Sequence, residues 1–150
     1  MRIIKLGIIS AIFFSLLITG ISLFIPSHIR ISKAVDINVP KDSIVNQIKD
    51  VDHWKKWYPG ADTMDLSGIK ISSVTDSSVI ASIEGSGMRK ASTGWNFYPS
   101  SVPNTVTIQW YMDFHLRWYP WEKFSSLLLE GRYGPMMEKG LSNLKKLLEK

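Results

Sequence analysis

The sequence predicts an α+β domain, with helices on one face of a curved antiparallel sheet. A single apolar helix precedes this domain in the chain. Three observations predict this arrangement. The chain has no charged residue from Leu6 to Ser27. Segments that alternate apolar and polar residues follow, with turn-forming residues between them. An apolar helical stripe then closes the chain. We therefore divide the chain into an anchor, residues 1–28, and one domain, residues 29–150, which is long enough to bury a core.

The N-terminal segment has the length of a single transmembrane helix. At about 1.5 Å per residue, a helix over residues 6–27 spans the roughly 30 Å hydrocarbon layer. A cleaved signal peptide and a buried helix of a soluble protein are the alternatives, but a signal peptide usually has an apolar run of only about 7–15 residues. Basic residues flank both ends: Arg2 and Lys5 on one side, Arg30 and Lys33 on the other. We expect a single-pass protein of the cell membrane, with a slight preference for a domain on the non-cytoplasmic side.

A strand and a helix are expected directly after the anchor. Residues 29–39 alternate between an apolar and a polar face, with Lys33 the one exception, and Pro40 ends the strand. Asp42 suits the positive end of the next helix. Apolar residues then recur at helical spacing as far as Trp54 and Trp57.

Hairpins and a second pair of helices are expected in the rest of the domain. The strand-like segments are Ile69–Val74, Val79–Glu84, Met88–Tyr98 and Val106–Leu116, with Asp76-Ser77-Ser78 and Gly85-Ser86-Gly87 as turn signals. A helical segment over Trp121–Glu130 is followed by Gly131 and Gly134, which interrupt it. Pro135 is expected in the first turn of the last helix, whose stripe is Met137, Leu141, Leu144 and Leu148.

Composition excludes several classes of function. The 18 Lys and Arg residues exceed the 13 Asp and Glu residues, but they are dispersed as pairs, so we expect no nucleic-acid partner. The absence of cysteine excludes disulfides, thiolate metal sites and a cysteine nucleophile. The three histidines, His28, His53 and His115, do not have the spacing of metal ligands. We therefore expect no metal and no cofactor, and we assign no catalytic residue.

A few polar residues are candidates for chemistry, each with an ordinary alternative. Asp113 and His115 share one face of a strand, where the carboxylate could orient the imidazole as a base, although a solvated pair is the more common arrangement. Arg89 and Arg117 could hold a ligand's carboxylate, or could simply be solvated. The Gly85-x-Gly87 motif is better explained as a hairpin turn than as a phosphate loop.

Aromatic residues are concentrated in the domain. All six Trp and all five Tyr follow residue 53. They could line a cavity for an apolar or ring-bearing ligand, or they could fill the core. A third possibility concerns Trp118, Tyr119 and Trp121, which could lie among lipid headgroups near the anchor.

Both ends of the domain resemble a known superfamily. The segment from Val35 to Pro40, followed by Trp54-x-x-Trp57-x-Pro59, is similar to the opening of the bacterial SRPBCC superfamily. These are START/Bet v 1-like domains of the polyketide cyclase/dehydrase and lipid transport type, and some have an N-terminal membrane helix. Residues 107–112 and 134–145 are similar to the ending. Between Trp57 and Val106 the chain is shorter than expected for the family and lacks its Gly/Glu-rich hairpins.

The resemblance implies a helix-grip fold, in which a curved antiparallel sheet wraps on a long C-terminal helix, preceded by a single transmembrane helix. It also implies that the domain binds a hydrophobic small molecule or lipid in an aromatic-lined cavity, without catalysis. A polyketide cyclase- or hydrolase-like enzyme and a protein-interaction or scaffold module at the membrane are the alternatives. The expected ligand-binding residues are Trp54, Trp57, Trp110, Met112, Phe114, Met137, Leu141 and Leu144. The membrane is expected to contact residues 6–27, and the sequence does not identify whether there is a protein partner.

Overall fold

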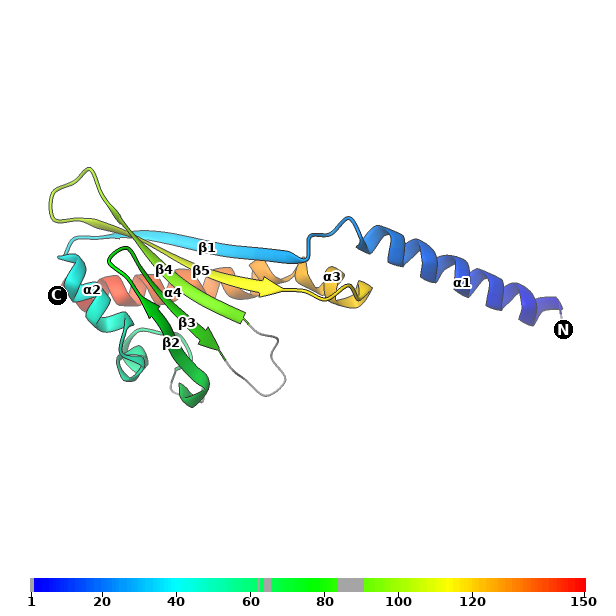
Figure 1. The fold of residues 1–150 in the computed structure, drawn as a ribbon, viewed down its shortest axis with the longest axis horizontal. Helices are drawn as coiled ribbons and strands as arrows, with labels where there is room; N and C mark the ends of the chain where they lie inside the picture. Colours follow the sequence, from blue (N-terminus) through cyan, green and yellow to red (C-terminus); the bar gives the residue numbers. More distant parts are fainter. Residues whose placement is uncertain (1, 62, 64–65, 84–90) are drawn as a thin grey trace.

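The structure, a computed structural model, describes residues 2–61, 63, 66–83 and 91–150. The predicted α+β class and helix-grip arrangement are confirmed: the described residues form an antiparallel sheet in the order β1-β5-β4-β3-β2, with the long helix α4 packed along it (Figure 1). The strands are β1 (His28–Ile37), β2 (Ile69–Val74), β3 (Ser78–Ile83), β4 (Ala91–Pro99) and β5 (Val106–His115). The helices are α1 (Arg2–Ser22), α2 (Lys41–Ile48), α3 (Pro120–Ser126) and α4 (Leu129–Leu148), with 3₁₀ helices η1 (Val51–Lys56) and η2 (Leu66–Gly68).

Strand β5 lies inside the sheet, between β1 and β4. It pairs with β1 from His28 opposite His115 to Ile37 opposite Val106, and with β4 on its other edge. The alternation in its sequence is reflected in the structure, because Ile108, Trp110 and Met112 are buried on the side of α4. The strands expected from the sequence are found, apart from Glu84 at the end of Val79–Glu84, the first three residues of Met88–Tyr98, and Leu116, which follows β5. Residues 84–90, which include the expected turn at Gly85–Gly87 and the candidate Arg89, lie outside the described residues.

The last helix differs from the expectation. It begins at Leu129 and continues through Pro135, whereas the sequence predicted an interruption at Gly131 and Gly134. A proline inside a helix removes one backbone hydrogen bond, but contacts with β1 support this turn. The ammonium of Lys33 lies 2.9 Å from Glu130 and 3.0 Å from Glu138, one on each side of the proline. These contacts also explain why Lys33 interrupts the apolar face of its strand.

Helix α1 extends away from the domain (Figure 1). Its 21 residues make it about 31 Å long at about 1.5 Å per residue, which matches the hydrocarbon layer of about 30 Å. Among the described helices, α1 alone is long and apolar enough to cross a membrane, by length and composition. Most of its side chains are exposed in the isolated chain.

Candidate functional site

Five aromatic rings meet between the sheet and α4. This aromatic cluster consists of Trp54, Trp57 and Tyr58 from η1 and the residues after it, Trp95 from β4 and Trp110 from β5, and all five are buried. Contacting rings have centroids 5.1 to 6.2 Å apart. Such ring pairs contribute about 0.5–1.5 kcal/mol each beyond the area they bury. The cluster therefore joins the segment after α2 to the sheet.

Helix α4 approaches the cluster at a glycine. A Cβ atom on Gly140 would lie 2.7 Å from Cζ3 of Trp110 and 3.0 Å from Cδ of Pro59. Both distances are too short for carbon atoms in van der Waals contact. Because no side chain stands at this position, the rings fill the layer between the sheet and this turn of α4.

The structure brings the predicted ligand-binding residues to this layer. Seven of the eight belong to the buried core between sheet and helices, and Phe114 packs against that core while contacting Tyr133, with ring centroids 5.0 Å apart. The seven are Trp54, Trp57, Trp110, Met112, Met137, Leu141 and Leu144. Their contact with a ligand stays a prediction.

Two of the buried indoles have no hydrogen-bond partner among the described residues. Nε1 of Trp54 donates to the carbonyl of Ile48 at 2.8 Å, and Nε1 of Trp110 donates to Oγ1 of Thr93 at 2.7 Å. The Nε1 atoms of Trp57 and Trp95 are buried without an acceptor. Burying an unpaired donor costs about 1–3 kcal/mol, so an acceptor at these nitrogens would stabilise the domain.

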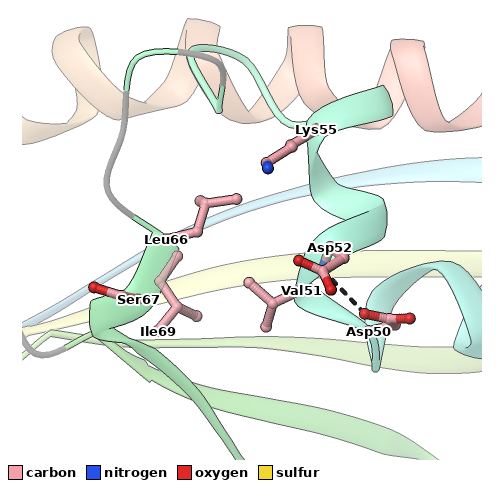
Figure 2. A pocket seen from close by; sticks show the side chains of 7 residues that line it. All are labelled: Asp50, Val51, Asp52, Lys55, Leu66, Ser67 and Ile69. Atoms are coloured by element: carbon pink, nitrogen blue, oxygen red, sulfur yellow. Dashed lines mark hydrogen bonds between the residues drawn. The ribbon is translucent and has the colours of Figure 1, made fainter.

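A pocket of about 510 Å³ opens beside the cluster, between η1 and the start of β2 (Figure 2). Its lining is Asp50, Val51, Asp52, Lys55, Leu66, Ser67 and Ile69. The apolar part of this lining belongs to the core or packs against it. The polar part is fixed at one point, because Oδ1 of Asp50 accepts from the backbone N–H of Asp52 at 3.0 Å and caps η1. The pocket therefore has a polar rim and an apolar floor.

The sequence analysis did not identify this pocket. Its residues come from two segments that are separated along the chain, so no local spacing marks them. The predicted ligand-binding residues are not part of its lining. Trp54 lies in η1, between Asp52 and Lys55 of the rim, so the pocket adjoins the aromatic cluster through this turn.

The polar candidates Asp113 and His115 lie on the sheet face opposite α4. The two carboxylate oxygens of Asp113 each accept a hydrogen bond from Arg30 at 2.7 Å, and Nε2 of His28 lies 3.4 Å away. The bond from Arg30 lowers the pKa of Asp113 below its ordinary value, against the opposing effect of burial. The imidazoles of His28 and His115 are stacked, with centroids 4.6 Å apart. This carboxylate is therefore held by a guanidinium on the face of the sheet opposite α4.

Arg117, the other polar candidate among the described residues, is also paired. Arg117 donates from Nε to Oε1 of Glu122 at 3.0 Å, and its NH2 nitrogen lies 2.9 Å from the same oxygen. Within the part of the chain that the structure describes, no group of three His, Cys, Asp or Glu residues could hold a metal ion.

Comparisons with solved structures agree with this fold. The chain is similar to the Zhui aromatase/cyclase from Streptomyces sp. R1128, with a TM-score of 0.54 and 12% identity over 81% of this chain and 94% of that one. It is similar to the di-domain ARO/CYC BexL from the BE-7585A biosynthetic pathway, with a TM-score of 0.59 and 12% identity over 81% of this chain and 46% of that one. Aha1 from Colwellia psychrerythraea gives a TM-score of 0.52 and 17% identity over 81% of this chain and 96% of that one.

No protein-family model and no curated protein sequence matches the chain. The identities to the solved structures are low, so the likeness concerns the fold. The fold is a helix-grip fold, like that of the aromatase/cyclase and Aha1 structures.

Proposed function

We propose that this protein is a membrane-anchored helix-grip domain that binds a hydrophobic, ring-bearing small molecule or lipid without changing it covalently. The ligand's rings would lie against the aromatic cluster, and its polar end would lie at the rim of the adjoining pocket. Helix α1 would hold the domain at the cell membrane, with a slight preference for the non-cytoplasmic side.

The unpaired indole nitrogens of Trp57 and Trp95 carry this proposal. They are two buried hydrogen-bond donors in surroundings that are otherwise aromatic. A ligand with an aromatic body and an oxygen acceptor satisfies both features, because it stacks with the rings and accepts from the indoles. The rings contact one another closely, so binding would separate them where the cluster adjoins the pocket.

Binding can be measured with prodan, a fluorescent naphthyl ketone whose emission shifts to the blue in apolar surroundings. The full chain in phosphatidylcholine nanodiscs should show saturable emission above that of empty nanodiscs. Ser67→Trp, which fills the pocket, should weaken binding about tenfold, equivalent to about 1.4 kcal/mol. Ser73→Trp is the matched control, because Ser73 is exposed on β2 outside the pocket lining. Emission equal to that of empty nanodiscs, or an equal effect of both substitutions, would contradict the proposal.

A cyclase-like enzyme is the second candidate, since two of the similar structures are an aromatase/cyclase and an ARO/CYC protein. Such an enzyme needs a polar group that can reach the bound molecule. Thr93 is a buried polar residue beside the cluster, and its hydroxyl already donates to the carbonyl of Tyr111 at 3.2 Å and accepts from Trp110. Mass spectrometry of the molecules that copurify with the full chain distinguishes a ligand-binding protein from a cyclase-like enzyme. A product whose formation is lost in Thr93→Val would favour the enzyme.

A further inference from the structure

Helix α3 has its polar side buried and its apolar side exposed. Glu122 and Lys123 are only 1% and 3% exposed, and Ser126 is buried as well. Trp121, by contrast, is 66% exposed, and Leu128, just after the helix, is 73% exposed. A surface helix of a soluble domain has the reverse arrangement, with its apolar stripe toward the core. In the isolated chain this inversion leaves an apolar face of the domain exposed.

Hydrogen bonds hold α3 in this orientation. The ammonium of Lys123 donates to the carbonyl of Ile25 at 2.7 Å and to Oγ of Ser27 at 2.6 Å. The carboxylate of Glu122 accepts from the backbone and side chain of Arg117 at 2.9 and 3.0 Å. Because these buried charges are bonded, rotating α3 to hide its apolar side would break several charge-assisted hydrogen bonds. The hydrogen bonds of the folded domain therefore keep the apolar side of α3 exposed.

The exposed apolar side lies beside the anchor. Lys123 joins α3 to the link between α1 and β1, and α3 lies at the end of the domain from which α1 leaves (Figure 1). Phe24, on that link, is 91% exposed. A bilayer crossed by α1 would have its surface close to α3, since the apolar run of the anchor ends at this link.

The aromatic residues here are of the types found at membrane interfaces. Tyr119 stacks on Trp121 with centroids 4.7 Å apart, and its ring contacts Trp118 in a tilted arrangement with centroids 4.9 Å apart. The guanidinium of Arg117 lies 5.1 Å from the centroid of the Tyr119 ring. Trp and Tyr are enriched at the level of lipid headgroups, and an arginine beside them suits the phosphates.

We propose that these side chains form a second membrane contact, here called the α3 surface: Trp118, Trp121, Phe124, Leu127 and Leu128. The occupant is the phospholipid bilayer that α1 crosses, so this inference rests on the anchor in the proposed function. An amphipathic helix lies in the interface with its apolar face about 5–10 Å deep. Two attachments, α1 and the α3 surface, then fix the tilt of the domain on the bilayer.

The absence of cysteine allows a direct test, because a single introduced cysteine can be labelled alone. The fluorophore NBD is attached to Leu128→Cys, to Ile12→Cys in α1 and to Val74→Cys, an exposed position on β2. Each full-length chain is placed in phosphatidylcholine nanodiscs with and without doxyl-labelled phosphatidylcholine. We expect doxyl lipid to quench the labels at Leu128 and Ile12 at least about threefold more than the label at Val74. Trp121→Gln with Leu127→Gln should reduce quenching at Leu128 and leave Ile12 unchanged.

The outcomes separate this inference from the anchor. If Ile12 is quenched while Leu128 behaves like Val74, the α3 surface is not in the bilayer and the anchor stands. If neither Ile12 nor Leu128 is quenched, the anchor fails, and this inference fails with it. If Leu128 is shielded from aqueous iodide but not quenched by doxyl lipid, a second copy of the chain covers the surface, and the inference is again overturned.

Discussion

Replacing Gly140 with alanine tests how tightly α4 closes on the aromatic cluster. The new Cβ would lie 2.7 Å from Trp110, whose ring is held by Trp57, Tyr58 and Trp95. Overpacking of this kind costs about 1–3 kcal/mol. Alanine also favours a helix over glycine by about 1 kcal/mol, so the net loss of stability should be about 0–2 kcal/mol.

Gly131→Ala provides the matched control, because Gly131 also lies in α4 and a Cβ there meets nothing within 4 Å. The helix propensity gained is the same, so the difference between the two variants isolates the steric contact at about 1–3 kcal/mol. Thermal unfolding of the full chain in detergent, followed by near-UV circular dichroism, measures it. At about 2–4 °C per kcal/mol, Gly140→Ala should melt about 2–12 °C below Gly131→Ala. Equal melting temperatures would refute the close approach of α4.

Three further predictions concern buried charges and a buried phenol. Because Arg30 lowers the pKa of Asp113, this carboxylate stabilises the fold above the ordinary value of 3.8. Asp113→Asn should therefore be less stable near neutral pH, and the gap in melting temperature should narrow as pH falls below that value; a constant gap would contradict this. Burial raises the pKa of Tyr58 to about 12, so its contribution to stability is present below pH 10 and is lost as pH rises toward 12. Tyr58→Phe should remove a late step from the tyrosinate absorbance titration, and an unchanged titration would count against the burial. Lys123→Met should cost about 1–3 kcal/mol in thermal unfolding by leaving backbone and hydroxyl acceptors unpaired, whereas the exposed Lys139→Met should cost little.

Local patterns were enough to predict the strands and the class of fold. The alternation around Trp110 and Met112 identifies β5 and its inward face, because a strand has a two-residue period. The stripe of Met137, Leu141 and Leu144 identifies the buried side of α4 in the same way. These signals lie within single elements, so they can be read before the tertiary structure is known.

Features that depend on contacts between distant segments could not be predicted in this way. The first turns of α4, from Leu129 through Pro135, are contacted by Lys33, which is remote in sequence and pairs with Glu130 and Glu138. The pocket joins η1 to the start of β2, and no spacing relates the two. Helix α3 exposes its apolar side, but its sequence predicts only an apolar helical segment. Only its tertiary contacts, through Lys123, determine which side is exposed.

Binding of a ring-bearing ligand at the aromatic cluster is tested most directly by the indole N–H resonances of the six tryptophans. The full chain, labelled with ¹⁵N-tryptophan in nanodiscs, would be titrated with prodan, and single Trp→Phe variants would assign the peaks. The proposed function predicts that the indole signals of Trp57 and Trp95 move downfield together and saturate, since their unpaired N–H groups gain an acceptor. The indoles of Trp54 and Trp110, which already have acceptors, should move less. If the Trp57 and Trp95 signals stay fixed at saturating prodan, the cluster is a filled core and the ligand-binding proposal is wrong.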